Sequence, residues 1–375
     1  MTNSTLEIDV IEVFQPIGNL YIGKIDGNTL YKMAKADIRK ITDNDQYLGI
    51  QRNLDRKRVE AIKKYIWTTD ASFPNSIILN ISSEDIVESS SNKLVLKISD
   101  NTFSIIDGQH RLAGFEEGNI ESFELVVAIF VDLDMEQQAV LFSTINTEQK
   151  KVDPSFKYDL ESYSSIETPR KVARDLALAF NTDTDSPWYR RIKMTGKKDR
   201  LSGDGIITLK AFIEPILSLI YPDKSDSYQI RDKIVNFENQ ENPSDKVKLN
   251  AVFDLNQYDN RKYIFWSMYV NEQEEIIFKI LLNYYKALYA NLKNDWGSKS
   301  SILTKTTGYN AIMYLLFDIY IIGMSKRDFS YEFFKEVLSP LKSLSGSLDS
   351  HTYGGSGESS SRRLYRDMIH RIKSN

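Results

Sequence analysis

The hydrophobic pattern changes near Pro154, and this change limits the possible folds more than any other feature of the 375-residue chain. Before Pro154, apolar runs rich in Ile, Val and Phe have the length of strands and lie between polar turns. After it, long segments carry apolar residues at helical spacing, and the strand signal largely disappears. We therefore predict an α+β fold, with a mixed sheet and helices in residues 1–155 and a mainly helical domain in residues 156–375.

The first domain should contain one sheet and at least two helices. Its strand-length runs are residues 76–81, 93–98, 102–107 and 124–132. Residues 54–67 repeat apolar side chains at helical spacing, and Asp134 is placed to cap a second helix that begins at Met135. The helical segments expected in the second domain are residues 169–180, 208–220, 258–292, 309–324 and 331–341.

The chain contains no cysteine, which excludes disulfides, thiolate nucleophiles and sulfur-ligated metals. Secreted chains of this size commonly carry some disulfides. Residues 1–10 lack the basic start and apolar block of a secretory signal. The longest apolar run, Met313 to Met324, is interrupted by Asp318 and is too short to span a bilayer. We expect a cytoplasmic protein without a membrane role.

The formal net charge is −4, so the protein as a whole is not a basic nucleic-acid coat. Basic residues nevertheless gather in residues 188–200 and near the carboxyl end, where they follow a glycine-serine stretch. The candidate DNA-binding residues in these two clusters are Arg190, Arg191, Lys193, Lys197, Lys198, Arg362 and Arg363. Ordinary surface charge is the commoner explanation of such clusters.

The run Asp107-Gly-Gln-His-Arg111 follows an apolar strand and opens a helix, an arrangement that suits an anion. Gly108 lets a ligand approach the backbone, and His110 and Arg111 supply hydrogen-bond donors. Asp107 would repel a phosphate unless it holds Mg²⁺, orients His110, or positions an attacking hydroxyl or water. The alternative is that Asp107 caps the helix and the run is a solvated turn.

Two further stretches could contribute to the same site. Gln51 and Arg52 lie just before the helix expected at residues 54–67, from where Arg52 could meet phosphate and Gln51 a base or ribose edge. Asn146 ends another expected helix and is followed by Lys150 and Lys151. By themselves these stretches are equally consistent with a basic surface helix and a polar helix end.

Taken together, these stretches resemble the DGQHR-domain family. That family is related to the DndB proteins of bacterial DNA-modification clusters and, more remotely, to the ParB and sulfiredoxin fold. The matching pieces, in the order the family shows over about the first 160 residues, are Gln51-Arg52, residues 73–79, residues 107–111, and Ile145-Asn146 with Lys150-Lys151. The resemblance implies a ParB/sulfiredoxin-like first domain. Sulfiredoxin chemistry itself requires a cysteine in the corresponding turn, which this chain lacks.

The resemblance also implies a nucleotide-binding pocket. Its nucleotide- and phosphate-binding residues would be Arg52, Gly108, Gln109, His110, Arg111 and Asn146. Catalysis would fall to Asp107, His110 and Gln51, with Asp107 also the candidate Mg²⁺ ligand. The implied cofactors are ATP and Mg²⁺.

The leading hypothesis is therefore a Mg²⁺-dependent ATPase that serves a DNA-modification or defence system, with the 7-deazapurine type favoured. The first alternative is a DndB-like DNA-binding regulator of a phosphorothioation system, without turnover. A small-molecule kinase ranks third. Expected partners are a nucleotide, DNA, other proteins of a modification cluster and a second copy of the chain.

Other chemistries are poorly supported by the sequence. The chain has three histidines, none paired at zinc-ligand spacing, and it contains neither a nucleophile elbow nor a Walker-type phosphate loop.

Overall fold

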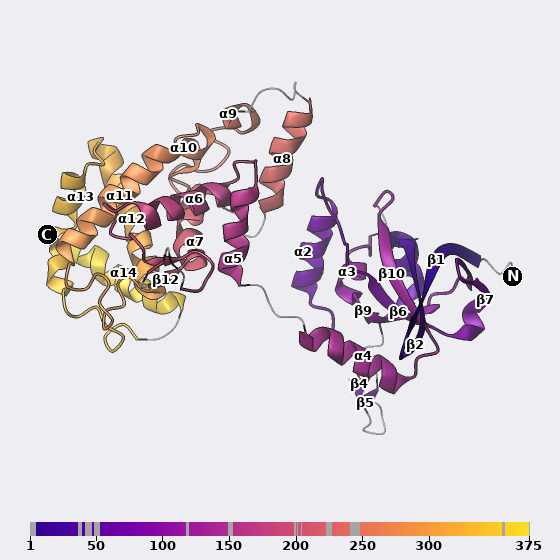
Figure 1. Ribbon diagram of the computed structural model, residues 1–375. Coiled ribbons are helices and arrows are strands. Elements are labelled where there is room, and N and C mark those ends of the chain that lie inside the picture. The colour runs from indigo at the N-terminus through magenta and orange to yellow at the C-terminus, as the bar shows by residue number, and fades with distance from the viewer. Residues whose placement is uncertain are drawn as a thin grey trace. The chain divides into compact units, whose positions relative to one another are not determined.

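The computed structural model describes residues 5–36, 40–41, 47–48, 53–117, 120–148, 153–198, 200, 202–203, 205–222, 227–240, 248–354 and 357–374. The chain divides into two compact units, Met1–Lys151 and Val152–Asn375. Figure 1 shows that the first carries the sheet and the second is mainly helical. The predicted α+β class is confirmed, and the division falls close to the boundary predicted after residue 155.

The first unit is built on a mixed sheet. Among the described residues this sheet has eight strands in the order β3-β9-β6-β10-β2-β1-β8-β7. Their bounds are β1 Thr5–Gln15, β2 Gly18–Asp26, β3 Ala34–Lys35, β6 Ile77–Ile81, β7 Ile86–Ser90, β8 Lys93–Lys97, β9 Phe103–Asp107 and β10 Glu124–Val131. β10 runs parallel to β6 and β3 runs parallel to β9, whereas the other neighbours are antiparallel. A two-residue pair, β4 Lys40–Ile41 and β5 Tyr47–Leu48, forms a separate ladder.

The four predicted strands are confirmed as β6, β8, β9 and β10. The β1–β2 hairpin was not predicted. In β1 the period-two alternation covers only residues 5–10, whereas Ile11 and Phe14 are 68% and 81% exposed. The mixed pattern of the second half weakens the signal by which strands are recognised.

Helices cover both faces of this sheet. They are α1 Gly27–Met33, α2 Arg56–Ile66, α3 Gln109–Ala113 and α4 Met135–Glu148. Ile105 and Ile106 are consecutive in β9, so their side chains point to opposite faces. Ile105 packs in the cluster that includes α1, α2 and α3, whereas Ile106 packs in the cluster that includes Leu141 and Phe142 of α4. The strand that ends in Asp107 is therefore central and covered on both faces.

The predicted cap of α4 is present. The side chain of Asp134 accepts a hydrogen bond from the Gln137 backbone N–H at 2.8 Å. The side chain of Gln137 in turn accepts from the Asp134 backbone N–H at 3.0 Å. This reciprocal pair is a capping box, which fixes where the helix begins.

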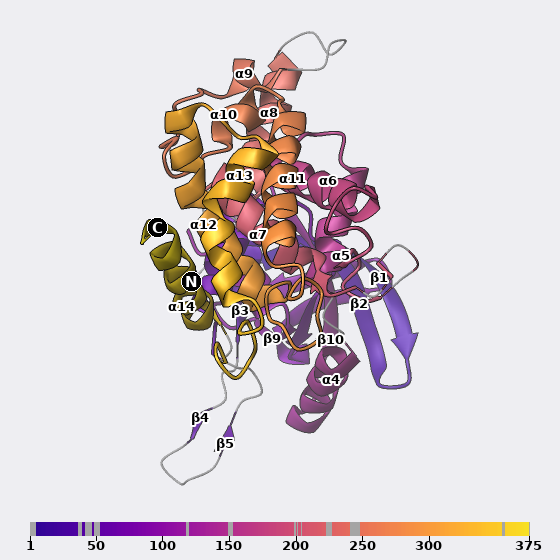
Figure 2. The same ribbon diagram turned by 90° about the vertical axis from the view of Figure 1, so that its left-hand side faces the viewer.

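The second unit is an assembly of helices (Figure 2). They are α5 Pro154–Asp159, α6 Pro169–Thr182, α7 Leu209–Ile220, α8 Ser227–Gln240, α9 Leu249–Val252, α10 Trp266–Val270, α11 Glu274–Asn291, α12 Thr306–Lys326, α13 Tyr331–Val337 and α14 Glu358–Lys373. Two short parallel strands, β11 Ile192–Lys193 and β12 Ile207–Thr208, lie between α6 and α7 along the chain. The single segment predicted at residues 258–292 is instead interrupted between α10 and α11, where Glu272 has φ +54°. A left-handed residue cannot continue a right-handed helix.

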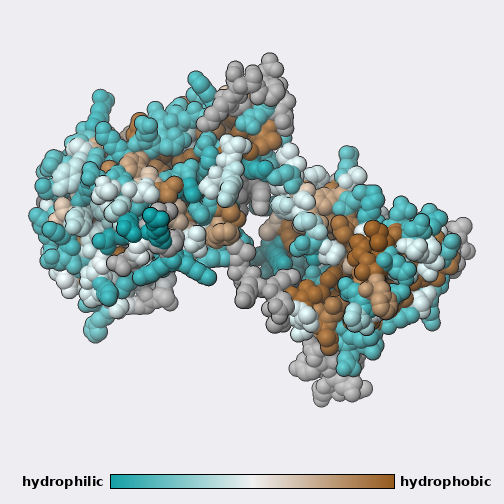
Figure 3. Space-filling model, in the orientation of Figure 1, coloured by the Kyte–Doolittle hydropathy of each residue, from teal (hydrophilic) through white to brown (hydrophobic). Residues whose placement is uncertain are grey.

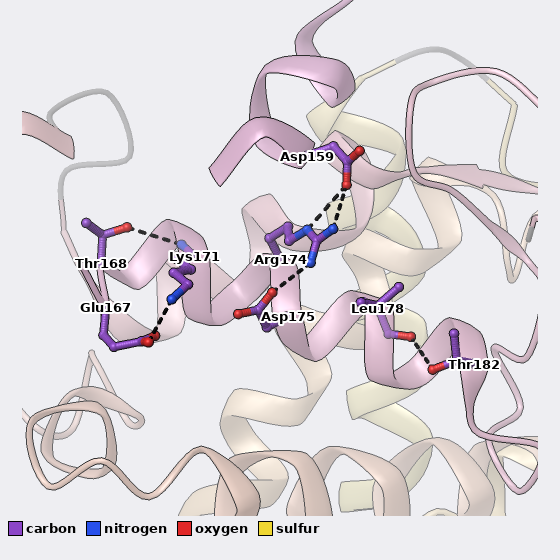
Figure 4. A network of polar contacts seen from close by, with 8 residues as sticks. All are labelled: Asp159, Glu167, Thr168, Lys171, Arg174, Asp175, Leu178 and Thr182. Carbon is purple, nitrogen blue, oxygen red and sulfur yellow. Dashed lines mark hydrogen bonds and ion pairs between the residues drawn. The ribbon is translucent and has the colours of Figure 1, made fainter. Parts of the chain in front are cut away.

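Charged side chains tie α6 to the chain before it (Figure 4). Arg174 donates to Asp159 at 2.9 Å and to its neighbour Asp175 at 2.8 Å. Thr168 caps α6 by accepting from the Lys171 backbone N–H, and the Lys171 ammonium pairs with Glu167 at 2.7 Å. These contacts hold the last residue of α5 against α6.

The apolar run Met313 to Met324, which was expected to be too short to span a bilayer, lies within a longer helix, α12. It is 21 residues long and, among the described residues, is the one helix long and apolar enough to cross a bilayer. However, 56% of its most apolar window is buried inside the protein, and it packs against α7 and α14. The helix therefore has the burial of a core helix.

The core of the second unit is dominated by aromatic rings. Phe212 of α7 stacks on Tyr309 at 4.9 Å between ring centroids and meets Trp188 edge-on at 5.2 Å. All three side chains are fully buried. Aromatic pairs in these geometries add to the stabilisation that comes from burying their area.

Replacing Phe212 with Ala should lower the free energy of unfolding by about 3–5 kcal/mol, because it removes a buried ring and leaves a cavity among its neighbours. Tyr163→Ala in the same unit removes a ring that is 88% exposed and should change it by about 0.5 kcal/mol or less. Urea unfolding followed by far-ultraviolet circular dichroism measures both. Equal losses would contradict the aromatic-core assignment.

Candidate functional site

The predicted signature lies where β9 ends and α3 begins. Asp107 is the last residue of β9 and pairs with Ile78 of β6 at a register shift. Gly108 has φ +101°, a conformation that L side chains rarely adopt. A Cβ atom at Gly108 would lie 2.6 Å from Cδ1 of Ile77. Both the backbone conformation and the close approach of Ile77 therefore require glycine at this turn.

Asp107 does not cap α3, contrary to the alternative raised from the sequence. The N-cap is Gly108, and no side chain caps the helix. Helix α3 is only five residues long, so its dipole is smaller than that of a full-length helix. Attraction of an anion to this turn must come mainly from side-chain cations.

Arg111 ties the turn to the segment before β6. Its Nη1 donates to the Asn75 carbonyl, and its Nη2 donates to the Ser76 carbonyl at 3.1 Å and to Oδ2 of Asp107 at 2.9 Å. The Arg111 side chain is 17% exposed and that of Asp107 is 25% exposed. Burial lowers the pKa of the Arg111 guanidinium, and the charge of Asp107 opposes that effect. We call this arrangement the Arg111 clasp.

His110 ties the same turn to α2. Its Nε2 accepts a hydrogen bond from the Asp55 backbone N–H at 3.0 Å, so the neutral ring carries its proton on Nδ1. Asp55 is the N-cap of α2 and accepts from the backbone N–H groups of Lys57 and Arg58. Burial is the main cause that lowers the pKa of His110, and the positive charge of Arg58 lowers it further. His110 is therefore neutral near pH 7.

Arg58 was not singled out as a site residue by the sequence analysis. Its charge lowers the pKa of both His110 and Arg111, which places it close to the turn. Its side chain is exposed and makes no ion pair or hydrogen bond with the rest of the described chain. The sequence held one signal: Arg58 lies in the first turn of a helix that follows the Gln51-Arg52 motif.

The other predicted site residues are distributed as follows. Gln51 and Arg52 lie outside the described residues, as do Lys150 and Lys151. Asn146 lies in α4, but its side chain is outside the described part. Gln109 is 8% exposed and is thus buried at the start of α3. Asp107, Gly108, His110 and Arg111 are brought together with Asp55 and residues 75–76.

Metal ligands are sparse near the turn. Within the described ranges, no three His, Asp or Glu side chains converge as a metal-binding group. Asp107 contacts Arg111 through Oδ2. A Mg²⁺ ion held by Asp107 would need phosphate oxygens and water as its other ligands, which is how Mg²⁺ is usually bound beside nucleotides.

The predicted DNA-binding residues differ in availability. Arg190, Lys197 and Lys198 are exposed, whereas Arg191 and Lys193 are half-buried. Arg362 is exposed but donates from Nε and Nη2 to Glu358 and lies over the ring of Tyr314. Arg363 lies over the ring of Tyr353. The first cluster therefore has more cations that are free of partners within the described chain than the second. The visible face of this unit is largely hydrophilic (Figure 3).

Comparison with known proteins gives one family match. The model of the DndB family, described as DNA-sulfur modification-associated, matches residues 8–233, which include nearly all of the sheet and the turn at residues 107–111. No curated protein matches the chain. Among solved structures, a C-terminally truncated chromosome-partitioning protein ParB from Caulobacter crescentus, complexed with CTP-gamma-S, is similar at 10% identity and a TM-score of 0.27. That match covers 58% of this chain and 86% of the ParB chain.

The His110 contact predicts a pH dependence of stability. Because its pKa is lower in the folded than in the unfolded chain, the unfolded state takes up the proton first as the pH falls. The stabilisation is complete above about pH 6.5 and should be lost as the pH falls through the folded-state pKa.

The measurement is urea unfolding at about pH 7.5 and about pH 5.5. In His110→Gln the amide oxygen can accept the Asp55 hydrogen bond without titrating, so the loss of stability between the two pH values should shrink. His351→Gln, at an exposed position in the second unit, is the matched control. An unchanged pH dependence in His110→Gln contradicts this role.

Proposed function

The chain belongs to the DndB family, whose members are associated with the sulfur modification of DNA. From this premise we propose that it binds ATP at the turn of residues 107–111 and hydrolyses it in the service of such a modification system. The family match favours sulfur modification over the deazapurine chemistry that the sequence analysis put first. An activity directed at DNA modification would operate in the cytoplasm.

One observation carries the proposal. Two hydrogen-bonded contacts, from Arg111 to residues 75–76 and from His110 to Asp55, join the signature turn to the segment before β6 and to the start of α2. A solvated surface turn has no need of a largely buried Arg–Asp pair and a half-buried imidazole that fix its position. Rigid placement of charged and polar groups is what phosphoryl transfer demands of a protein.

Charge around the turn supports phosphate binding. The Arg111 clasp neutralises Asp107, which removes the repulsion that an isolated carboxylate would exert on a phosphate. Arg58 stands near His110 and Arg111 without an ion-pair partner in the described chain. Arg52 precedes Asp55 by three residues and would add a second cation. We assign the phosphates to Arg58 and Arg52.

The remaining residues would orient the nucleotide and the attacking water. Gln51 and Asn146 would bind the rest of the nucleotide, whereas Gln109 is buried and the space beside Gly108 is filled by Ile77 and Arg111. In hydrolysis, a water oxygen attacks the γ-phosphorus, the bond to the bridging oxygen breaks, and ADP leaves. Oδ1 of Asp107, opposite the oxygen held by Arg111, would hold Mg²⁺ or that water. Bound Mg²⁺ would neutralise charge on the phosphates.

Release of inorganic phosphate from ATP tests the proposal. Asp107→Asn and Arg58→Gln should each lower the rate by about 10-fold or more, the usual cost of removing one charged group from a phosphoryl-transfer site. Lys57→Gln, an exposed neighbour on the same helix, should change it less than about twofold. Calorimetric titration with ATP, CTP and GTP would establish the preferred base.

Arg58→Gln keeps the test clear of folding defects, because the Arg58 side chain is exposed. The enzyme proposal is wrong if the wild type, Asp107→Asn and Arg58→Gln release phosphate equally slowly. If ATP binds but is not hydrolysed, the site is a nucleotide sensor and the ATPase proposal falls.

A second candidate is a DNA-binding regulator without turnover. The family association with DNA favours it, as do the exposed cations Arg190, Lys197 and Lys198 in the second unit. Each cation that meets a DNA phosphate releases a counterion, so binding should weaken steeply with salt.

A mobility-shift assay over a range of salt concentrations tests this second candidate. The slope of log affinity against log salt should become shallower by about two for the double variant Lys197→Gln, Lys198→Gln. The change for Arg362→Gln should be smaller, because that guanidinium is already held by Glu358. A salt response that is flat in the wild type counts against the regulator.

A further inference from the structure

A groove of about 930 Å³ lies in the helical unit and is lined by residues of that unit alone. Its walls come from the segment between α6 and β11, from α11 and from the start of α13. Helix α11 packs against both α6 and α13, and Figure 2 shows it between them. All three walls therefore belong to one compact unit.

Three tyrosines line this groove. Tyr189 is 39% exposed and Tyr289 is 37% exposed, while Tyr331 is half-buried. The ring of Tyr289 meets Trp296 edge-on at 90°, which fixes its plane. Several large rings of this unit are fully buried, Trp188 and Tyr285 among them, whereas Tyr189 and Tyr289 are partly exposed. Rings that converge from three segments on one open groove offer stacking surfaces to a ligand.

Two cations line the same groove. The Arg191 guanidinium packs at Gly297, which has φ +76° and no side chain to block it. In the part of the chain that the structure describes, Arg191 makes no ion pair and no side-chain hydrogen bond. Lys286 approaches Asp185 at 3.4 Å, a loose pair in which Asp185 is 78% exposed. Exposed ion pairs of this kind contribute little and are readily exchanged for another anion.

A basic loop begins at this groove. Arg190, next to Arg191, has φ +54° and donates to the carbonyl of Arg200 at 3.0 Å. That bond draws together the two ends of the segment that carries Lys197 and Lys198. The loop that carries Lys197 and Lys198 is therefore joined directly to the wall of the groove at Arg191.

Aromatic rings combined with arginine and lysine in an open groove are the chemistry that binds single-stranded nucleic acid. Unpaired bases stack on the rings, and the cations follow the phosphates. A duplex keeps its bases stacked inside the helix and offers only its phosphates to such a surface. An acidic peptide would use the cations but would leave the tyrosines without a stacking partner.

We propose that this groove binds an unpaired segment of DNA, with bases on Tyr189 and Tyr289 and phosphates on Arg191 and Lys286. The choice of DNA over RNA rests on the family association. The proposal extends the DNA-binding role suggested above to a particular form of DNA, and it does not require ATP hydrolysis. The groove thereby supplies contact with unpaired bases at a site separate from the nucleotide turn.

The test is fluorescence anisotropy of a labelled oligothymidine of about 12 nucleotides, and of a duplex of equal length, with the full chain. Tyr189→Ala combined with Tyr289→Ala should weaken oligothymidine binding by about 10-fold or more, since each lost stack costs about 1–3 kcal/mol. Duplex binding should change less than about twofold, because phosphates alone carry it. Tyr163→Ala, at a tyrosine of the same unit that does not line the groove, is the matched control.

Arg191→Gln combined with Lys286→Gln should weaken oligothymidine binding and make its salt dependence shallower. Circular dichroism and ATP binding should stay unchanged in all variants, which separates loss of the groove from loss of the fold or of the nucleotide site.

The proposal is overturned if the tyrosine variant binds oligothymidine like the wild type. It is also overturned if polyglutamate competes as well as oligothymidine, since this would indicate attraction to any polyanion. If the variants bind oligothymidine like the wild type and the protein binds the duplex, the groove proposal is wrong but the DNA-binding regulator is still supported.

Discussion

The Arg111 clasp is the interaction on which the candidate nucleotide site depends. One guanidinium satisfies two backbone carbonyls and one carboxylate in a largely buried place. Each of these acceptors would cost free energy if it were buried without a donor. The clasp therefore fixes the segment before β6 against the end of β9, and it makes Asp107 compatible with a neighbouring phosphate.

The clasp also determines what His110 can do. Because Arg111 fixes the turn, His110 can reach Asp55, the N-cap of α2, and accept its backbone N–H. A neutral imidazole that holds a helix start is a positioning group, and Arg58 is the exposed cation whose charge acts on it. In the proposed site, the signature motif positions the neighbouring cations and also contributes binding groups of its own.

The helical unit is stabilised mainly by aromatic packing rather than by a buried charged pair. Its largest rings pack against one another in a closed aromatic core, which leaves no face of Trp188 or Tyr309 for a ligand. Outside this core, three tyrosines line one open groove. The protein combines a rigid, charge-neutralised turn in one unit with an aromatic, basic groove in the other.

The sequence by itself determined the features that depend on neighbouring residues: the strands at β6, β8, β9 and β10, the helices α2 and α4 with its capping box, and the change of pattern near Pro154. These follow from side-chain period and local hydrogen bonds, which a short window contains. Only the tertiary structure decided the partners of Arg111, the hydrogen bond to His110, and the placement of Tyr189, Tyr289 and Tyr331 around one groove. Each of these features joins residues from different elements, and local periodicity carries no information about which distant segments will come together.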